Sequence, residues 1–347
     1  MAEPGGGLGD LRGFDAGKSV KTPERILFIR TDRIGDVLLN LPAIRLLRQT
    51  FPKSWIALIL DQSLKGLIDG HPDLDELIFV DASQIKKSPA ARRDLCRKIR
   101  GASFDLAVIS NPDKWMHFLA FWSRIPQRVG YERKWGFFLT RRIPDRKAVS
   151  GRHEIESNLE LVGLVSDKTW DEKLFFPVHE KAAAKVKALL AQYKIEGKLA
   201  LIHPGTSDPA KRWDPERFAE VSDHLQKKEG FSTVLIGGPE EAPAAAAVMK
   251  HVKIPTVDWT GRLDLSELAA FLSHPQVKLL ISSDSGPVHI AWIQGVPVVA
   301  LYSKGAPGSD PRRWGPRDSK SEVIHKAMPL IFSEEVCGLA EKILARE

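Results

Sequence analysis

The sequence predicts an α/β protein built from two doubly wound, Rossmann-like parallel-sheet domains that face a central cleft. Short apolar runs typical of buried strands alternate with stretches of helical periodicity through both halves of the chain. Strands that alternate with helices form parallel sheets, because right-handed crossovers place helices on both faces. The chain has 347 residues, more than the roughly 250 to 300 at which a single core usually stops growing.

The composition is that of an ordinary soluble protein, with 43% hydrophobic and 27% charged residues. No apolar run reaches the ~18 residues of a membrane span, and residues 1–20 lack the apolar core of a signal peptide. Cys96 and Cys337 lie far apart and indicate neither a disulfide framework nor a metal site. We therefore expect a cytoplasmic protein. Its formal net charge of +7 points to an anionic partner: nucleic acid, an acidic membrane surface or a phosphorylated small molecule.

The first half is predicted to hold a flexible glycine-rich tail, residues 1–22, and an N-terminal domain, residues 23–170. Apolar runs predict strands at 26–30, 55–60, 76–80 and 104–110. Helical spacing predicts helices at 37–51, 63–69, 90–100, 113–122 and 152–165. Pro42 either kinks the first of these helices or marks its true start. The polar, proline-containing segment 166–177 is the expected interdomain linker.

The second half, residues 171–347, is predicted to repeat this architecture as a C-terminal domain. Strands are expected at 199–203, 233–236, 279–282 and 297–302, with a short one near 257. Helices are expected at 180–193, 215–228, 240–252, 266–273 and 288–294. An amphipathic helix at 333–345 closes the chain and is a candidate to pack back on the first domain.

The turn at residues 284–287 is the most informative local feature. A buried strand ends there and feeds directly into a helix, so free backbone N–H groups and the positive end of the helix face outward. Gly286 allows a ligand to approach the backbone closely, and Pro287 suits the first helical turn. The turn therefore predicts a phosphate site, with the alternative that Asp284 only caps the helix.

Three polar loops follow strands of the second half, at 203–211, 237–241 and 284–289. Ligands of open α/β sheets bind beyond the carboxyl ends of the strands, where these loops meet. Together the loops offer hydroxyl groups and N–H groups for phosphate, a lysine, and carboxylates for ribose hydroxyls. We expect a nucleotide diphosphate to bind there. Taken singly, a Gly-Thr-Ser sequence is usually a turn and a lysine such as Lys211 is usually solvated.

In the first half, Asp36 is the notable carboxylate, because it follows Gly35 in the loop after the first strand. It is a candidate catalytic base, an N-cap is the alternative, and Asp32 competes for the role. P-loop, dinucleotide-binding, serine-hydrolase and zinc-protease motifs are missing. Asp73 and Asp75 match a D-x-D metal motif but lead directly into a predicted strand, so we expect no metal site.

A basic stretch at 124–147 carries eight lysines and arginines against Glu132 and Asp145. Its charge suits an acidic ligand, and a solvated face is the alternative. An aromatic-rich segment precedes it, but no RNA-binding module accompanies the two, so we expect no nucleic acid partner.

Four segments in this order resemble glycosyltransferase family 9, the ADP-heptose:lipopolysaccharide heptosyltransferases, over residues 26–345. They are ILFIRTDRIGDVLLNLPAIRLLRQTFP, HPGTSDPAKRW, LIGGPEE and ISSDSGPVHIAWIQGVPVVALY. The resemblance implies a GT-B fold, with the acceptor bound mainly by the first domain and the nucleotide sugar mainly by the second.

The resemblance also assigns roles to residues. It makes Asp36 and Lys211 catalytic, and leaves the ribose carboxylate at Glu241 with Glu240 as the neighbouring alternative. The other nucleotide-sugar contacts it implies are Thr206, Ser207, Lys211, Asp284, Ser285, Gly286 and His289. The acceptor contacts, one from the resemblance and three from the basic stretch, are Arg30, Arg124, Arg128 and Arg133.

The reaction implied is an inverting transfer of heptose from ADP-heptose to an anionic lipopolysaccharide inner-core acceptor, without a metal or other cofactor. With its basic first domain, the protein is expected to contact the cytoplasmic face of the inner membrane weakly. A nucleotide-sugar 2-epimerase of the same fold and a non-catalytic nucleotide-sugar-binding protein are the alternatives. The sequence predicts no oligomeric state.

Overall fold

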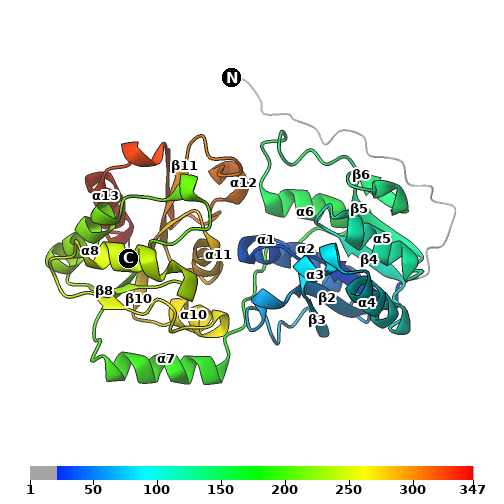
Figure 1. Cartoon of the computed structure of the whole chain (residues 1–347), viewed down its shortest axis with the longest axis horizontal. Coiled ribbons are helices and arrows are strands. Elements are labelled where there is room, and N and C mark those ends of the chain that lie inside the picture. Colours follow the sequence, from blue (N-terminus) through cyan, green and yellow to red (C-terminus); the bar gives the residue numbers. More distant parts are fainter. Residues whose placement is uncertain (1–21, 347) are drawn as a thin grey trace.

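The computed structural model describes residues 22–346, which form two α/β domains lying side by side (Figure 1). Apart from Thr22, the predicted glycine-rich tail lies outside the described residues. Each domain contains one six-stranded sheet in which every pairing is parallel. The predicted fold class is therefore confirmed. No helix within residues 22–346 is long and apolar enough to cross a bilayer.

The N-terminal domain has the strand order β3-β2-β1-β4-β5-β6. Its strands are β1 (Arg25–Ile29), β2 (Trp55–Asp61), β3 (Glu76–Val80), β4 (Leu106–Ile109), β5 (Gln127–Tyr131) and β6 (Arg141–Ile143). One face of the sheet is covered by α1 (Ile34–Leu38), α2 (Leu41–Thr50) and α6 (Glu154–Val162). The other face is covered by α3 (Ala82–Lys87), α4 (Pro89–Gly101) and α5 (Lys114–Trp122). Alternate residues of the central strands point to these two layers, so both faces are buried.

The C-terminal domain has the order β12-β11-β10-β7-β8-β9. Its strands are β7 (Leu199–His203), β8 (Ser232–Leu235), β9 (Val257–Asp258), β10 (Val277–Ser283), β11 (Val298–Ser303) and β12 (Glu322–Lys326). One face packs against α8 (Pro215–Glu229), α9 (Ala242–Met249) and α13 (Ser333–Leu344). The other packs against α7 (Glu180–Gln192), α10 (Leu265–Leu272) and α11 (Gly286–Ile293), while α12 (Pro311–Trp314) lies after β11.

Several elements differ from the sequence prediction. The helix expected at 63–69 is only a 3-10 turn, η1 (Gln62–Leu64), and α3, β5, β6 and β12 were not predicted. Pro42 marks the start of α2 and does not kink a longer helix. The closing helix α13 does not pack back on the first domain, because Val336 and Ala340 on its apolar face are buried in the core beside α8.

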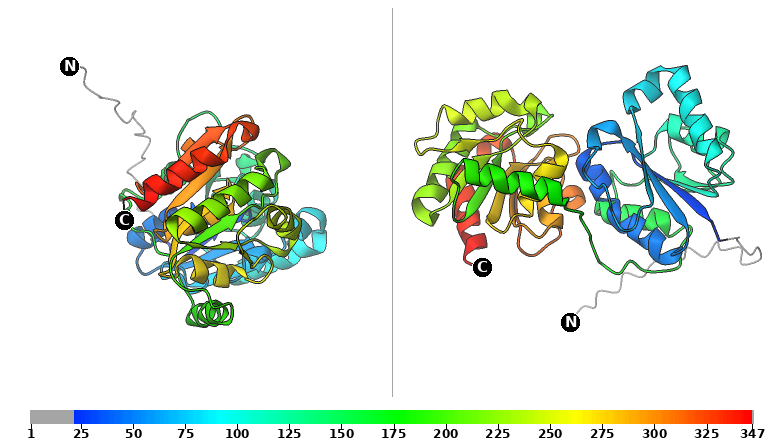
Figure 2. Two further views of the ribbon diagram at one scale, coloured as in Figure 1. Left: turned by 90° about the vertical axis from the view of Figure 1, so that its left-hand side faces the viewer. Right: turned by 90° about the horizontal axis from the view of Figure 1, so that it is seen from below.

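The chain passes between the domains once, through residues 163–179, which hold no helix or strand (Figure 2). This segment is tied to the N-terminal domain, since Asp171 accepts a hydrogen bond from Arg45 at 3.0 Å. The predicted linker lies within it.

The domains touch where α1 meets α11, the first helix after β1 and the helix after β10. Glycines make this approach possible. Gly35 lies against the His289 ring, and a Cβ at Gly286 would lie 2.9 Å from Ile34 Cδ1. Because both helices begin at carboxyl ends of strands, the loops of the two sheets face each other at this contact.

Candidate active site

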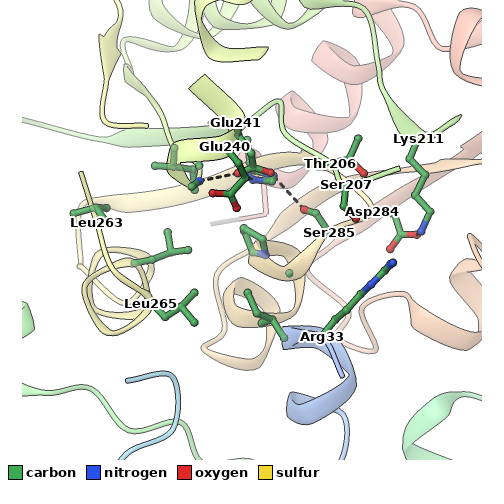
Figure 3. A pocket seen from close by; sticks show the side chains of 18 residues that line it. Arg33, Thr206, Ser207, Lys211, Glu240, Glu241, Leu263, Leu265, Asp284 and Ser285 are labelled. Atoms are coloured by element: carbon green, nitrogen blue, oxygen red, sulfur yellow. Dashed lines mark hydrogen bonds and ion pairs between the residues drawn. The ribbon is translucent and has the colours of Figure 1, made fainter. Parts of the chain in front are cut away.

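A pocket of about 240 Å3 lies at the carboxyl edge of the C-terminal sheet (Figure 3). The loops after β7, β8 and β10 form its polar wall, while Ile236, Leu263, Leu265 and Leu268 form an apolar wall. Figure 3 also shows Arg33 reaching in from the N-terminal domain toward Asp284. Arg33 was not among the site residues predicted from the sequence. The pocket thus combines a polar wall, which suits charged groups, with an apolar wall, which suits a flat apolar ring.

The loop after β7 places Thr206, Ser207 and Lys211 in this pocket, as the sequence predicted. Lys211 is nearly buried, so the solvated alternative is wrong. Its Nζ donates to Asp284 Oδ2 at 2.6 Å, a bond that joins the loops after β7 and β10. Asp284 therefore holds the lysine ammonium beside the first turn of α11.

The turn into α11 leaves the helix N-terminus open. Ser285 is the N-cap residue, and its side chain makes no capping hydrogen bond. Its hydroxyl instead contacts His203 Nδ1 at 3.1 Å and Ser282 Oγ at 2.9 Å. Asp284 is occupied by Lys211, so it is not the helix cap. The free N–H groups at Gly286 and beyond are oriented to bind an anion.

The loop after β8 distinguishes the two adjacent glutamates. Glu241 points inward, where it accepts a hydrogen bond from the Gly238 N–H at 2.8 Å and lies 3.0 Å from His203 Nε2. Burial acts to raise the pKa of Glu241, but these two hydrogen bonds outweigh it and lower the pKa. Glu240 is exposed at the rim of the same pocket. Glu241 therefore has an ionised carboxylate that is fixed in place by hydrogen bonds.

His289 lies on α11 at the contact between the domains, 4% exposed. Burial lowers the pKa of its imidazole, although the carboxylates of Asp284 and Asp36 act to raise it. The ring is therefore neutral near pH 7. Its Nδ1 is buried and makes no hydrogen bond within residues 22–346.

Asp36 lies in the first turn of α1, inside the helix, whose N-cap is Arg33. The N-cap interpretation of Asp36 is therefore wrong. The Arg30 guanidinium donates a hydrogen bond from Nη2 to Asp36 Oδ1. The other candidate base, Asp32, pairs with Arg30 Nε at 2.9 Å, and burial raises its pKa against that opposing charge. Arg30 thus orients both carboxylates.

Behind Arg30 lies a buried ion-pair cluster that the sequence did not reveal. Its centre is Glu154, whose side chain is fully buried at the start of α6. Glu154 Oε1 lies 2.5 Å from Lys147 Nζ and 3.5 Å from Arg30 Nη1. Burial acts to raise the pKa of Glu154, but its three cationic neighbours outweigh burial and lower the pKa to about 2.

The third cation comes from the other domain. Arg313 on α12 donates two hydrogen bonds to Glu154 Oε2, at 3.0 and 2.9 Å. Beside it, His153 Nε2 lies 3.0 Å from the Gly315 carbonyl oxygen. Contacts therefore run from the C-terminal domain through Arg313, Glu154 and Arg30 to Asp36. Arg313 and Glu154 lie 159 positions apart, which is why the sequence pattern did not reveal their contact.

The four predicted acceptor arginines lie in different places. Arg30 is 4% exposed and its guanidinium is taken up by carboxylates, so it has no surface to offer an acceptor. Arg124 and Arg128 lie before or at the start of β5, at the amino edge of the sheet, while Asp36 lies at the carboxyl edge. Closeness in sequence to Arg133 therefore does not place these two arginines at its edge of the sheet, and their role as acceptor contacts stays a prediction. Arg133 follows β5 at the carboxyl edge and pairs with Asp145 at 3.0 Å.

The D-x-D carboxylates serve the structure. Asp73 pairs with Arg45 at 2.9 Å, and Asp75 pairs with Arg48 at 2.5 Å and accepts the Ile56 N–H at 2.7 Å. Within residues 22–346, no group of three or more His, Cys, Asp or Glu side chains is arranged to hold a metal ion.

Two Rossmann-like domains, with a polar pocket on the second and a carboxylate on the first helix of the other, have the architecture of a GT-B protein. The comparisons with known proteins agree. A model of glycosyltransferase family 9 (heptosyltransferase) matches residues 92–334, more than half of the chain. The chain belongs to this family, as the four sequence segments indicated.

Individual relatives are distant but cover almost the whole chain. Lipopolysaccharide heptosyltransferase 3 of Escherichia coli K12 is 25% identical over 338 residues, 90% of this chain and 96% of that protein. A glycosyl transferase family 9 structure from Veillonella parvula matches with a TM-score of 0.85 at 26% identity, covering 93% and 98% of the two chains. The E. coli ADP-heptose heptosyltransferase II structure matches at 0.76 and 21% identity, covering 93% and 99%, and shows the shared fold.

Proposed function

We propose that the protein transfers a heptose from ADP-heptose to an anionic lipopolysaccharide inner-core acceptor, with inversion at the anomeric carbon and without a metal cofactor. The observation that carries this proposal is the juxtaposition of Lys211 and the open end of α11 with Asp36 across the domain contact. Family membership supports the reaction class, and the named relatives support the donor and acceptor.

On the donor side, the pocket offers a partner for each part of an ADP-sugar. The apolar wall at Leu263 and Leu265 suits the adenine ring, and the held carboxylate of Glu241 suits ribose hydroxyls. The diphosphate would lie at the N-terminus of α11, where Lys211 and the hydroxyls of the β7 loop add donors. As the bond to the sugar breaks, charge develops on the leaving ADP, and these fixed donors stabilise it.

On the acceptor side, Asp36 is the proposed base. An acceptor hydroxyl attacks the anomeric carbon from the face opposite the diphosphate while its proton passes to Asp36. A carboxylate is a weak base, so the proton moves late, when the attacking oxygen has become acidic. Arg30 fixes the orientation of the Asp36 carboxylate. Arg133 lies at the same edge of the sheet with its side chain 59% exposed, where it can bind phosphates or acidic sugars of the acceptor.

The proposed location is the cytoplasm, with weak peripheral contact to the anionic inner membrane. No nucleic acid partner is proposed.

The deciding experiment supplies ADP-heptose, a truncated inner-core acceptor and the purified protein, with and without EDTA. We expect a product of inverted anomeric configuration by NMR, formed at the same rate in the chelator. In parallel, a thermal-shift screen against ADP, UDP, GDP and CMP should show selective stabilisation by ADP, independent of magnesium. Preference for UDP, with a change at the sugar and no transfer, would instead support an epimerase. Binding without turnover would support a non-catalytic role.

A further inference from the structure

A contiguous aromatic surface covers the outer side of the N-terminal domain, away from the nucleotide pocket. We call it the aromatic patch, and it consists of Phe118, Phe121, Trp122, Trp135, Phe137 and Phe138. Four of its members are strongly exposed: Phe121 47%, Trp122 41%, Trp135 38% and Phe137 67%. Elsewhere in residues 22–346, the exposed Phe and Trp side chains, Trp55, Phe175 and Phe332, come from separate segments of the chain. A clustered apolar surface of this kind marks an interaction site.

Two segments build the patch. The core side of α5 is formed by Met116, Leu119 and Ala120, and His117 is buried as well. Apart from Lys114, the remaining residues of the helix are Trp115, Phe118, Phe121 and Trp122, so its outer side is aromatic without being covered. The second segment is η2 (Gly136–Phe138), which follows β5 and whose Phe138 stacks on Phe121 with ring centroids 4.9 Å apart.

The turn before η2 is conformationally costly. Lys134 and Trp135 have φ values of 47° and 68°, in the left-handed region that residues other than glycine rarely adopt. This turn leads into η2, which packs against α5, and it brings the Trp135 ring centroid to 5.4 Å from that of Trp115. The patch is therefore a built feature of the fold.

Cations surround the rings. Residues 86–134 hold twelve lysines and arginines against four aspartates and glutamates. Lys114 Nζ lies 5.5 Å from the Trp135 ring centroid, and the Arg128 guanidinium lies 5.5 Å from that of Phe121. Aromatic rings beside lysine and arginine are typical of the boundary between lipid headgroups and acyl chains.

The position of the patch relates it to the catalytic edge. α5 starts after the carboxyl end of β4, the strand next to β1, and runs back to the amino edge. Figure 1 shows α5 on the side of the N-terminal domain remote from the C-terminal domain. A surface bound there would leave the interdomain space open, with Lys114 and Trp135 at the end nearer Asp36.

We propose that the aromatic patch docks on the surface of an anionic phospholipid bilayer. Its rings enter the headgroup region while the arginines and lysines around it contact lipid phosphates. Docking itself does not depend on the proposed reaction; its use, which is to bring a lipid-anchored acceptor to the carboxyl edge, rests on the proposed function. RNA fits less well, because no RNA-binding module accompanies the aromatic segment in the sequence.

The test is flotation of the full-length protein with vesicles of phosphatidylethanolamine and phosphatidylglycerol, compared with vesicles of phosphatidylcholine alone. We expect co-flotation with the anionic vesicles, weaker at high salt. The double variant Phe121→Ser with Phe137→Ser should lower partitioning at least about tenfold, because two exposed rings no longer insert. The matched control, Phe175→Ser with Phe332→Ser, removes two equally exposed rings elsewhere and should float like the wild type.

All variants should bind ADP with unchanged affinity, which shows that they are folded and separates docking from donor binding. The proposal is overturned if the patch variant floats like the wild type. It is also overturned if the patch instead mediates a concentration-dependent dimer, or if the protein binds random-sequence RNA through these residues and ignores the vesicles.

Discussion

The two domains share one sheet topology but use the carboxyl edge of that sheet in opposite ways. In the N-terminal domain this edge is filled by ion pairs around Glu154, which hold Asp36 in place. In the C-terminal domain the same edge is hollow, with a pocket of about 240 Å3. The same sheet topology therefore carries a fixed carboxylate in the N-terminal domain and leaves space for a large anion in the C-terminal domain.

The difference arises in the first loops. After β1 the chain continues with Arg30 and Asp32, whose side chains fold inward and pair. After β7 it continues through Gly205, where a Cβ would collide with the Glu241 carboxylate. Large charged side chains fill the first site, while in the second the missing side chain at Gly205 makes room for the Glu241 carboxylate.

The variant Asp36→Asn is the strongest test of the role assigned to the fixed carboxylate of the N-terminal domain. The amide keeps the size of the side chain but cannot accept the acceptor proton, so we expect transfer to fall at least about 100-fold. ADP affinity should be unchanged, because the nucleotide lies in the other domain. Single-turnover kinetics and calorimetry measure the two quantities. Turnover near the wild-type rate would remove Asp36 from the mechanism.

A second test asks whether the filled edge depends on the other domain. Arg313→Gln removes the cation that joins Glu154 to α12, and we expect kcat to fall about tenfold as Arg30 and Asp36 lose their fixed geometry. KM for the donor should change little. Arg312→Gln is the matched control, since Arg312 is 75% exposed and pairs only with nearby Asp310. Equal kcat values for the two variants would show that the interdomain ion pair is not needed for positioning.

The hollow edge is tested by its two glutamates. Glu241→Gln should weaken ADP binding roughly fivefold to tenfold, since a charge-assisted bond to a ribose hydroxyl is lost. Glu240→Gln should change it less than about twofold, because that side chain lies at the rim. Isothermal titration calorimetry with ADP measures the two affinities. A larger loss of ADP affinity in Glu240→Gln than in Glu241→Gln would assign the ribose contact to Glu240.

The smallest expected effect concerns the pH dependence of stability at the domain contact. Burial lowers the pKa of His153 to about 4, although the Gly315 carbonyl acts to raise it. In the neutral ring Nδ1 accepts the Ile155 N–H, at 3.2 Å, while Nε2–H can donate to Gly315.

Between about pH 6.5 and 4, the unfolded chain binds a proton at His153 that the folded protein excludes, so stability falls as pH falls through this window. Thermal unfolding from pH 7.5 to 4.5 should therefore show a shallower pH dependence in His153→Asn than in the wild type. Identical slopes would mean that this imidazole does not govern the acid response. The buried Glu154 carboxylate acts lower, between about pH 4.5 and 2.

The apolar runs in the sequence predicted most of the buried strands. β3 and β7 have the predicted bounds, because each is a run dominated by apolar residues, although β3 lies at an edge of its sheet. β6 (Arg141–Ile143) and β12 (Glu322–Lys326) are edge strands rich in charged residues, so no apolar run marks them. The sequence pattern therefore predicted most strands of each sheet and missed β5, β6 and β12.

The candidate site divides in the same way. Thr206, Ser207, Lys211 and Asp284 converge in one pocket because each follows a strand, a position that sequence order reveals. Glu154 and Arg313 converge only through the contact of two domains, and no local pattern encodes that. Arg124 and Arg133 lie at opposite edges of the sheet for a related reason, since β5 runs between these two residues from the amino edge to the carboxyl edge.

The single passage of the chain between the domains has an evolutionary consequence. Each domain is one uninterrupted stretch of the gene, and residues 163–175 belong with the first, to which Arg45 and His71 tie them. A crossover between codons 176 and 180 would exchange one entire half and leave the other intact. Recombination could then pair a new first domain with an old second domain, provided that the partners of Glu154 and His289 at the junction are inherited together.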